Sequence, residues 1–554
     1  MAHDLRIKSE LLAPLAALAY VQQGGGSYYG QLRKSSDPVL AVGAWCGLLD
    51  GKLVGHAFWD ELAALGRYEA IRSRAYTYFE DLLEHELARK VATTDVVSRS
   101  GLEQALMLAD LDRNAAAAAE AEGGLYLATG DIEHVLKASA RAETGGGWRA
   151  GLAWALRAIL IAPLAAVPVQ RLFVVLESSG QPDLLQEVAE IFVSRNLNLP
   201  VAQVFLAGAA YMRGDAELCL AKLRPLDDAK VAANKLLAPY SGAIRTLRAQ
   251  AKEKLGHYKQ AYEGYVALND AERDRSINPD NFYKGIEVRG RLAIPALPPD
   301  EHPDVVQMLG FPRSGTTLLE NALAAHPQIE TFEEIPGVTV AIDRIERVLL
   351  GKVPPEPPEV TFAAARQKYY GEVESRRHKA GATVLVDKMP IRSADAAFIS
   401  KLFPEWRYIF SIRHPYDVIL SCFKQRFLPN PAMENFRSIA AASRLYDQTM
   451  TEWFNHHTLH DPAVHYVRYD QLVTDFDRVA GGTLDFLGVP WDDKVRDFSK
   501  SAEKRAAMTP SYQKVRQGLS IGVQTAWRNY GFVFQSDAAK PLRKWVEFFG
   551  YEAE

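Results

Sequence analysis

The sequence predicts two successive architectures, an all-helical first part and a second part of the α/β class with a parallel sheet. The first part is rich in Ala and Leu, low in strand-forming residues and divided by short turn signals. Beyond a proline-rich stretch near residue 295, apolar strands alternate with helical segments. The 554 residues are also enough for several domains.

The composition excludes several classes of protein. With 48% hydrophobic and 24% charged residues, the chain has ample material for buried cores and is not a wholly disordered protein. Its 64 Lys and Arg against 68 Asp and Glu argue against a nucleic-acid partner, although local basic pockets for small anions remain compatible. Three scattered cysteines without Cys-x-x-Cys spacing argue against a disulfide scaffold or a structural zinc site.

The apolar run at residues 11–21 is too short to span a bilayer and follows Asp4 and Glu10. We interpret it as the apolar face of a helix and not as a signal peptide. We therefore expect a cytoplasmic protein without a membrane span.

Similar turns recur through residues 1–290, which we predict to form one helical domain. Residues 65–70 (LGRYEA) resemble residues 255–261 (LGHYKQA), and further Gly-containing turns stand at residues 130, 180 and 214. Gly180 and Gly214 are 34 residues apart, a period that resembles the tetratricopeptide repeat. Other steps, of 50 and 42 residues, depart from that period, so an irregular helical bundle stays open.

Stacked helical hairpins of this kind form a curved solenoid with a concave surface. Such a surface is a platform for a peptide or protein partner. Nothing in this part of the sequence has the pattern of a catalytic residue.

The second domain is predicted to occupy residues 300–554, after the boundary marked by prolines at 295, 298, 299 and 303. Strands are expected near residues 304–310, 383–386, 407–412 and 464–468, with a helix from about residue 315. This alternation predicts a parallel sheet covered by helices on both faces. Ligands of such sheets bind beyond the carboxyl ends of the strands.

The first strand runs into the segment Gly310 to Thr317 (GFPRSGTT), which is followed by a helix. Gly310 and Gly315 allow backbone amides to converge on an anion at the helix N-terminus. The spacing fits a phosphate-binding loop, but Thr316 stands where nucleotide triphosphatases carry a lysine.

The missing lysine decides between two kinds of transfer. Phosphoryl transfer needs the loop lysine and magnesium to offset concentrated charge. A sulfuryl group linked to a phosphate carries less charge, so hydroxyls, amides and the guanidinium of Arg313 could suffice without a metal. An ordinary helix-capping turn is the simpler alternative.

The stretch FPRSGTTLLENALAAHPQIETFEE resembles the 5′-phosphosulfate loop of sulfotransferases and is especially similar to that of the tyrosylprotein sulfotransferases. The resemblance covers roughly residues 304–530, and the addition of helical repeats resembles the bacterial tetratricopeptide-repeat sulfotransferases. It implies 3′-phosphoadenosine 5′-phosphosulfate (PAPS) as donor, the bisphosphate PAP as product and no metal. It also implies donor contacts by Arg313, Ser314, Gly315, Thr316 and Thr317.

A second anion site is expected after the strand at residues 407–412. A nucleotide with a separate 3′-phosphate needs such a site, and Arg413 with Ser421, eight residues later, provides a cation and a hydroxyl. In sulfotransferases the matching pair binds the 3′-phosphate. A pairing of Arg413 with Asp417 is the alternative, and Gln425 replaces a further arginine of the family, between Lys424 and Arg426.

Three later segments resemble family elements around the nucleotide. Tyr469 matches a tyrosine that contacts the adenine, with packing at a strand end as the alternative. Ser511 matches a serine near the sulfuryl bridge. Arg516, in the same segment as Ser511, is also predicted to bind the nucleotide. Trp527, with Arg528, resembles the closing element of these domains, and simple packing is the alternative for it.

The resemblance also implies the catalytic groups. Glu334 matches the family's base for the acceptor hydroxyl, with Glu333 beside it, and Lys388 matches a lysine that neutralises charge on the bridging oxygen. Two solvated glutamates in a loop and a surface lysine are the alternatives. Pro336 stands where the tyrosylprotein enzymes have an arginine that engages the acceptor. His326, in an Ala-His-Pro context, is interpreted as a structural turn.

These observations predict a PAPS-dependent sulfotransferase whose acceptor is a peptide or protein tyrosine. A carbohydrate or lipid hydroxyl stays open as the acceptor. A non-catalytic scaffold with a nucleotide-binding domain, a kinase-like enzyme and a homodimer are further alternatives that the sequence does not decide.

Overall fold

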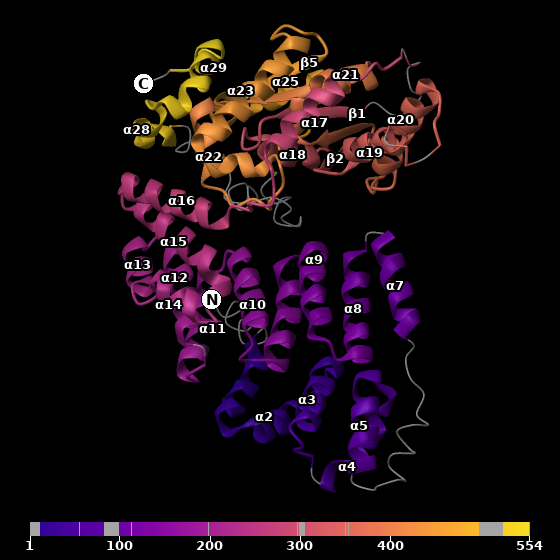
Figure 1. Cartoon of the computed structure of the whole chain (residues 1–554), viewed down its shortest axis with the longest axis vertical. Helices are drawn as coiled ribbons and strands as arrows, with labels where there is room; N and C mark the ends of the chain where they lie inside the picture. The colour runs from indigo at the N-terminus through magenta and orange to yellow at the C-terminus, as the bar shows by residue number, and fades with distance from the viewer. Residues whose placement is uncertain are drawn as a thin grey trace. The chain divides into compact units, whose positions relative to one another are not determined.

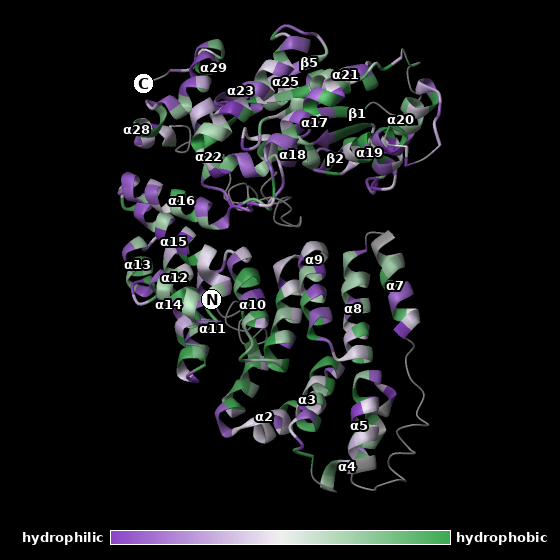
Figure 2. Ribbon diagram, viewed as in Figure 1, coloured by the Kyte–Doolittle hydropathy of each residue, from purple (hydrophilic) through white to green (hydrophobic). Residues whose placement is uncertain are grey.

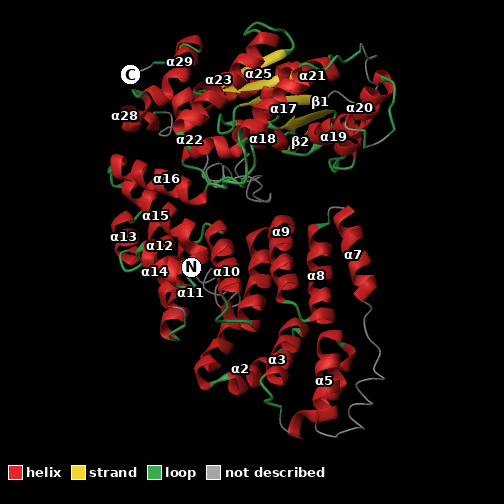
Figure 3. Ribbon diagram, viewed as in Figure 1, coloured by secondary structure: helices red, strands yellow, loops and turns green. Residues whose placement is uncertain are grey.

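The computed structural model describes residues 12–54, 56–81, 99–111, 114–197, 199–295, 297, 305–349, 351–352, 354–497 and 525–552. The chain divides into two compact units, Met1–Gly264 and Tyr265–Glu554. The regular elements in the described residues of the first unit are all helices, joined by turns and loops, whereas the second unit contains a sheet (Figure 3). The predicted domains, residues 1–290 and 300–554, have bounds that differ from those of the two units, whose boundary lies within helix α16. The predicted domains therefore stay a prediction.

The first unit is a succession of helices (Figure 1). They are α2 (Gly25–Leu32), α3 (Pro38–Asp50), α4 (Trp59–Ala64), α5 (Glu69–Asp81), α7 (Arg99–Leu111), α8 (Ala115–Thr129), α9 (Ile132–Ile161), α10 (Ala166–Ser178), α11 (Pro182–Ser194), α12 (Leu199–Met212), α13 (Ala216–Leu223), α14 (Asp228–Ala233), α15 (Ser241–Lys254) and the first part of α16 (Tyr258–Glu272). An apolar segment at Ala13–Gln23 forms a 3-10 helix.

The predicted turns end helices for a local reason. Gly130 and Gly214 have φ angles of 72° and 93°, in the left-handed region that favours glycine. The next residues cap the following helices, because the side chains of Asp131 and Asp215 accept hydrogen bonds from backbone amides of their first turns. The helical hairpins are therefore confirmed, and the tetratricopeptide-type repeat stays a prediction.

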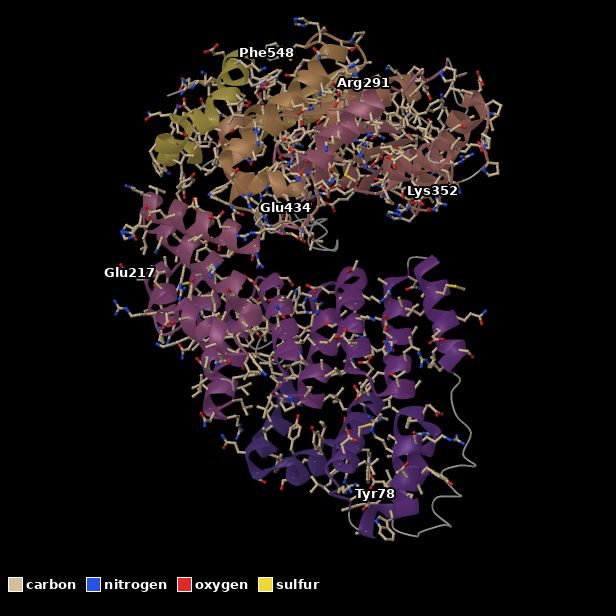
Figure 4. The ribbon with its side chains drawn as sticks, in the orientation of Figure 1. Tyr78, Glu217, Arg291, Lys352, Glu434 and Phe548 are labelled. Carbon is tan, nitrogen blue, oxygen red and sulfur yellow. The ribbon has the colours of Figure 1, made fainter. Side chains whose placement is uncertain are left out.

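Apolar faces of these helices form two clusters. One gathers side chains of α9 to α15 and includes a stacked pair, Phe173 and Phe205, with ring centroids 4.9 Å apart. The other includes Trp45 of α3, Phe79 of α5 and Tyr126 of α8. Polar side chains such as Glu217 of α13 lie on the surface (Figure 4).

The second unit is built on a five-stranded parallel sheet. The strands are β1 (Val305–Gly310), β2 (Ile329–Glu333), β3 (Val384–Lys388), β4 (Arg407–Ile412) and β5 (Val464–Arg468), in the order β2-β3-β1-β4-β5. The sequence-based prediction of a parallel sheet and of four of these strands is confirmed. Figure 2 shows a mostly hydrophobic strand β1, as expected for a central strand that is buried on both faces.

Helices surround this sheet. They are α17 (Asp280–Gly290), α18 (Thr316–Ala325), α19 (Gly337–Leu349), α20 (Pro358–Glu374), α21 (Ala396–Leu402), α22 (Pro415–Phe423), α23 (Ile439–His456), α24 (Tyr469–Thr474), α25 (Phe476–Leu487), α28 (Gly531–Phe534) and α29 (Arg543–Phe548). Val306 and Ile409 belong to one apolar cluster with α18 and α25, whereas Phe410 stacks on Trp453 of α23. Because neighbouring residues of a strand face opposite sides, helices cover both faces, as predicted.

The sequence analysis missed strand β2. Two glutamates, Glu330 and Glu333, interrupt the apolar pattern that a buried strand is expected to have, although the first four residues of β2 are buried. The carboxylate of Glu330 accepts hydrogen bonds from the backbone amides of His378 at 2.7 Å and Lys379 at 3.2 Å, in the segment before β3. A buried acid is tolerated there because the chain supplies donors for it.

Candidate active site

The loop between β1 and α18 forms a cradle of backbone and hydroxyl groups. Gly315 has φ of 100° where α18 begins, and Ser314, Thr316 and Thr317 are buried. The buried Ser314 hydroxyl has no hydrogen-bond partner among the described residues. A glycine-bounded turn with buried hydroxyls at a helix N-terminus fits an anionic group.

Two guanidinium groups lie beside this loop. Arg313 Nε donates to Ser421 Oγ at 3.0 Å, and Arg413 Nη1 donates to the carbonyl oxygen of Arg313 at 3.3 Å. Burial lowers the pKa of Arg313, and the neighbouring Arg413 acts in the same direction. Two adjacent cations in a buried setting are stabilised by a bound anion.

Ser421 was predicted to act together with Arg413. In the structure the Ser421 hydroxyl accepts from Arg313, and Arg413 approaches Asp417 at 4.0 Å, so the joint role of Arg413 and Ser421 on a 3′-phosphate stays a prediction. The loop arginine and the serine of α22 are thus adjacent, although 108 residues separate them. The predicted 5′ and 3′ anion sites therefore adjoin each other.

Tyr469, at the end of β5, packs directly on the loop. A Cβ added to Gly315 would lie 2.3 Å from its ring atom Cδ2, so only glycine leaves room for this ring. On the same ring, the guanidinium carbon of Arg413 lies 4.5 Å from the centroid. Three motifs singled out in the sequence therefore meet at one place.

A cavity of about 410 Å³ adjoins these groups. It is lined by Arg413, His414, Asp417, Arg468, Tyr469, Asp470, Thr525, Trp527, Arg528, Gly550, Tyr551 and Glu552. Sequence reasoning missed His414, Arg468 and Asp417 as lining residues. Their position in the sequence could have identified two of them, because His414 lies just beyond the carboxyl end of β4 and Arg468 is the last residue of β5.

Trp527 is buried by packing at this cavity. Its ring stacks on His414 with centroids 4.8 Å apart, and its backbone amide donates to Asp417 Oδ1 at 3.1 Å. Burial lowers the pKa of His414 to about 4, so this imidazole is neutral at physiological pH. Arg528 pairs with Glu552 at 2.6 Å.

The cationic segment after α22 is engaged by nearby residues. Arg426 pairs with Glu272 at 2.7 Å, and Gln425 donates to the carbonyl oxygen of Arg426 at 3.2 Å. The ammonium of Lys424 lies 5.5 Å from the ring centroid of Tyr530. Lys424 therefore lies next to the 3-10 helix at Ala526–Tyr530 that carries Trp527.

A lysine between two carboxylates occupies the ends of β2 and β3. Lys388 Nζ donates to Glu333 Oε1 at 3.0 Å and to Glu334 Oε1 at 3.2 Å. The Lys388 side chain is fully buried, Glu333 is nearly so, and Glu334 is 44% exposed. A cation and an accessible carboxylate thus adjoin at the carboxyl edge of the sheet.

Beneath this group lies a polar cluster that the sequence did not reveal. Asp387 Oδ2 accepts hydrogen bonds from Tyr369 OH at 2.9 Å and Gln307 Nε2 at 3.1 Å. Burial is the main cause that raises the pKa of Asp387 to about 6. The only sequence signal was an acid directly before Lys388 at a strand end.

His326 contributes to a structural turn, as expected from the sequence. Its Nε2 lies 2.8 Å from the carbonyl oxygen of Pro490, and its Nδ1 accepts from the backbone amide of Gln328. The predicted residues Ser511 and Arg516 lie outside the described residues. Within the described ranges, no cluster of His, Cys, Asp and Glu could hold a metal ion, and no helix is long and apolar enough to cross a membrane.

Comparison with known proteins gives a match to a family model over part of the chain. Residues 305–493 match the model of the Sulfotransferase family. The chain is 26% identical to protein-tyrosine sulfotransferase 1 of Danio rerio over 34% of its own length and 53% of that protein. It is 29% identical to nodulation protein NoeE of Sinorhizobium fredii over 22% and 31% of the two chains.

Other similar proteins include an uncharacterized protein of Aquifex aeolicus, 28% identical over 50% of this chain and 38% of that one. The chain thus spans between 31% and 53% of the length of these relatives. Among solved structures, the sulfotransferase domain from the Synechococcus PCC 7002 olefin synthase aligns at 22% identity with a TM-score of 0.35, covering 47% of this chain and 99% of that domain. The sulfotransferase domain from the curacin biosynthetic pathway aligns at 19% identity with a TM-score of 0.33, covering 46% and 100%.

Proposed function

We propose, from the sulfotransferase family domain at residues 305–493, that this protein transfers a sulfuryl group from PAPS to an acceptor hydroxyl. One observation carries the proposal. The lysine-free loop at Gly315 packs on Tyr469, and Arg413 and Ser421 converge on the same place. This arrangement suits a nucleotide with phosphate groups at two positions better than a magnesium-bound triphosphate.

The residues present fit such a donor. The buried Ser314 hydroxyl lacks a partner among the described residues, and the space beside Gly315 is closed to any larger side chain. Backbone amides and hydroxyls from Ser314 to Thr317 would hold the 5′ end. Arg413 and Ser421 would hold the 3′-phosphate, and each charge-assisted hydrogen bond is worth about 1.5 to 3 kcal/mol.

When bound, the donor supplies a sulfuryl group whose bond to the phosphate oxygen breaks, with its electron pair, as the acceptor oxygen forms a new bond to sulfur. Glu334, the more exposed carboxylate, takes the proton of the acceptor hydroxyl on Oε1 or Oε2. The Lys388 ammonium offsets the negative charge that develops on the departing oxygen. Ser511 is assigned to the same bridging region and Arg516 to the nucleotide.

A peptide or protein tyrosine is the acceptor that we favour. The Glu333-Glu334 pair and the similarity to protein-tyrosine sulfotransferases support it. The helical unit would hold the acceptor chain, and a cavity of about 420 Å³ between α11, α12 and α13 offers one place for it. Pro336, in place of an arginine, keeps a carbohydrate or lipid hydroxyl as the second candidate.

Calorimetric titration of the full chain tests the donor class. PAP is expected to bind without magnesium, and ATP with magnesium is expected to bind more weakly. Preference for magnesium-ATP would overturn the assignment in favour of a kinase-like enzyme.

A labelled-donor assay against a tyrosine-peptide panel and a glycan panel tests the reaction and its acceptor. Glu334→Gln is expected to lower kcat by ~10² to 10⁴-fold, because the acceptor proton loses its base. Glu346→Gln, at an exposed position of α19, is the matched control and should behave as the wild type. Transfer to glycans alone would defeat the peptide proposal, and no transfer to any acceptor would favour the scaffold alternative.

A further inference from the structure

The proposed reaction gives no role to the carboxylate of Glu333. Residues 333 and 388 are direct partners in the pairing of β2 with β3, so their side chains emerge side by side from neighbouring strands. The Oε1 to Nζ distance is 3.0 Å, and Glu333 is only 9% exposed. This contact is therefore fixed by the sheet itself.

Lys388 needs anionic neighbours to stay protonated. Its side chain has no exposed surface, and burial alone would lower its pKa. The carboxylates of Glu333, Glu334 and, more remotely, Glu320 of α18 outweigh that effect and hold the pKa of Lys388 above its ordinary value. Each of these three acids therefore favours the charged form of Lys388.

The three acids are not equivalent during the proposed reaction. Glu334 becomes neutral when it accepts the acceptor proton, at the moment when the charge of Lys388 is needed. Glu320 accepts a hydrogen bond from the Thr331 hydroxyl at 2.5 Å, and its influence on Lys388 ranks below that of Glu333. Burial raises the pKa of Glu333, and the Lys388 ammonium opposes that effect. Glu333 is therefore the carboxylate whose charge and whose contact with Lys388 support each other.

We infer that Glu333 is a positioning residue, which keeps the Lys388 ammonium protonated and in place while Glu334 takes up the acceptor proton. This inference rests on the proposed function. It divides the Glu-Glu pair into an exposed base and a buried anchor. It also explains why the two neighbouring carboxylates differ so much in exposure.

The variant Glu333→Gln tests the inference in the full chain, with Glu330→Gln as control. Glu330 is a buried carboxylate of the same strand, but its hydrogen bonds run to the segment before β3 and not to Lys388. The first readout needs no donor. The protonation of Lys388 is followed by NMR of labelled lysine side chains across alkaline pH, with its signal assigned from Lys388→Arg.

In the wild type and in Glu330→Gln, Lys388 is expected to stay protonated to the highest pH at which the protein is folded. In Glu333→Gln its titration is expected to move to lower pH. The second readout is the pH profile of kcat, whose alkaline limb should move to lower pH in Glu333→Gln alone. At neutral pH kcat should fall about tenfold or more, a part of the roughly 10²-fold loss expected from removing the ammonium itself.

Glu333→Asp keeps the carboxylate and should restore most of both readouts. The inference fails if Lys388 titrates alike in the wild type and Glu333→Gln, or if folded Glu333→Asp behaves like Glu333→Gln. Absence of any sulfuryl transfer by the wild type would instead overturn the proposed function, because the NMR titration still reports on the Glu333–Lys388 contact.

Discussion

Two residues of the candidate site, Arg313 and Glu334, adopt a left-handed backbone, with φ of 73° and 49°. Such a conformation costs about 1 to 3 kcal/mol for a non-glycine residue and persists only where the surroundings enforce it. Here the carbonyl oxygen of Arg313 accepts from Arg413, and the amide of Glu334 donates to the carbonyl oxygen of Lys388 at 2.8 Å.

Asp387 gives a prediction on pH and stability. Its pKa of about 6 lies above that of an unfolded aspartate, so the folded state is favoured by protonation and loses this stability as pH rises through about 6. At pH 8, Asp387→Asn should therefore have a free energy of unfolding roughly 3 kcal/mol higher than that of the wild type. It should unfold at a higher denaturant concentration. Denaturant titrations from pH 4 to pH 8 should show this difference shrinking towards pH 4.

Asp461 is the control with the opposite sign. Burial acts to raise its pKa, but hydrogen bonds from His457 and from the amide of Ala463 lower it overall. Asp461→Asn should destabilise the protein at pH 8, and the loss should fade as pH falls below about 4. Equal pH profiles for the two variants would contradict both assignments.

At the scale of the element, each strand of the sheet except β2 could be predicted, and so could the turn after β1. These signals are local, since an apolar run followed by glycines and hydroxyls specifies a strand, a turn and a helix start within a few residues. Strand β2 was missed because one carboxylate oxygen of Glu330 accepts hydrogen bonds from backbone amides 48 and 49 residues away. A prediction from neighbouring residues alone treats such a glutamate as evidence against a buried strand.

Gly315→Ala tests the turn between β1 and α18. The variant should be destabilised by more than about 1 kcal/mol, because alanine disfavours a φ of 100° and its Cβ would collide with Tyr469. PAP affinity, measured by calorimetry, should fall as well. Gly371→Ala is the control, since no atom lies within 4 Å of an added Cβ in α20, and it should leave binding unchanged and raise stability by up to about 1 kcal/mol. Unchanged PAP affinity in Gly315→Ala would contradict the role of this turn.

At the scale of the whole molecule, the chain forms two compact units of unlike architecture. Only the second contains the residues that we assign to the donor. Apolar side chains dominate the core of each unit, whereas surface positions such as Arg291, Lys352 and Phe548 lie at the exterior of the second (Figure 4). Ligand binding should therefore stabilise one unit and not the other.

Differential scanning calorimetry of the full chain tests this consequence. We expect two unfolding transitions, and PAP should raise the temperature of only one of them. At a hundredfold excess of PAP over Kd, the free energy of unfolding of that unit should increase by about 2.7 kcal/mol. Ser421→Ala should weaken this effect, because it removes a hydroxyl from the site. A single transition that shifts as a whole with PAP would show that the two units unfold together.

Local sequence patterns predict the class of each half and the strand, turn and helix start around Gly315, and they give the order of the chemical groups along the chain. Glycine turns, helix caps and apolar runs act over a few residues, so these features need no knowledge of distant contacts. Which of these groups contact one another depends on the tertiary fold. The sheet order puts β3 between β2 and β1 and thereby sets Lys388 beside Glu333 and Glu334, while packing brings Ser421 to Arg313. Such pairings depend on which strands and helices become neighbours, and that choice is made by the burial of the whole core.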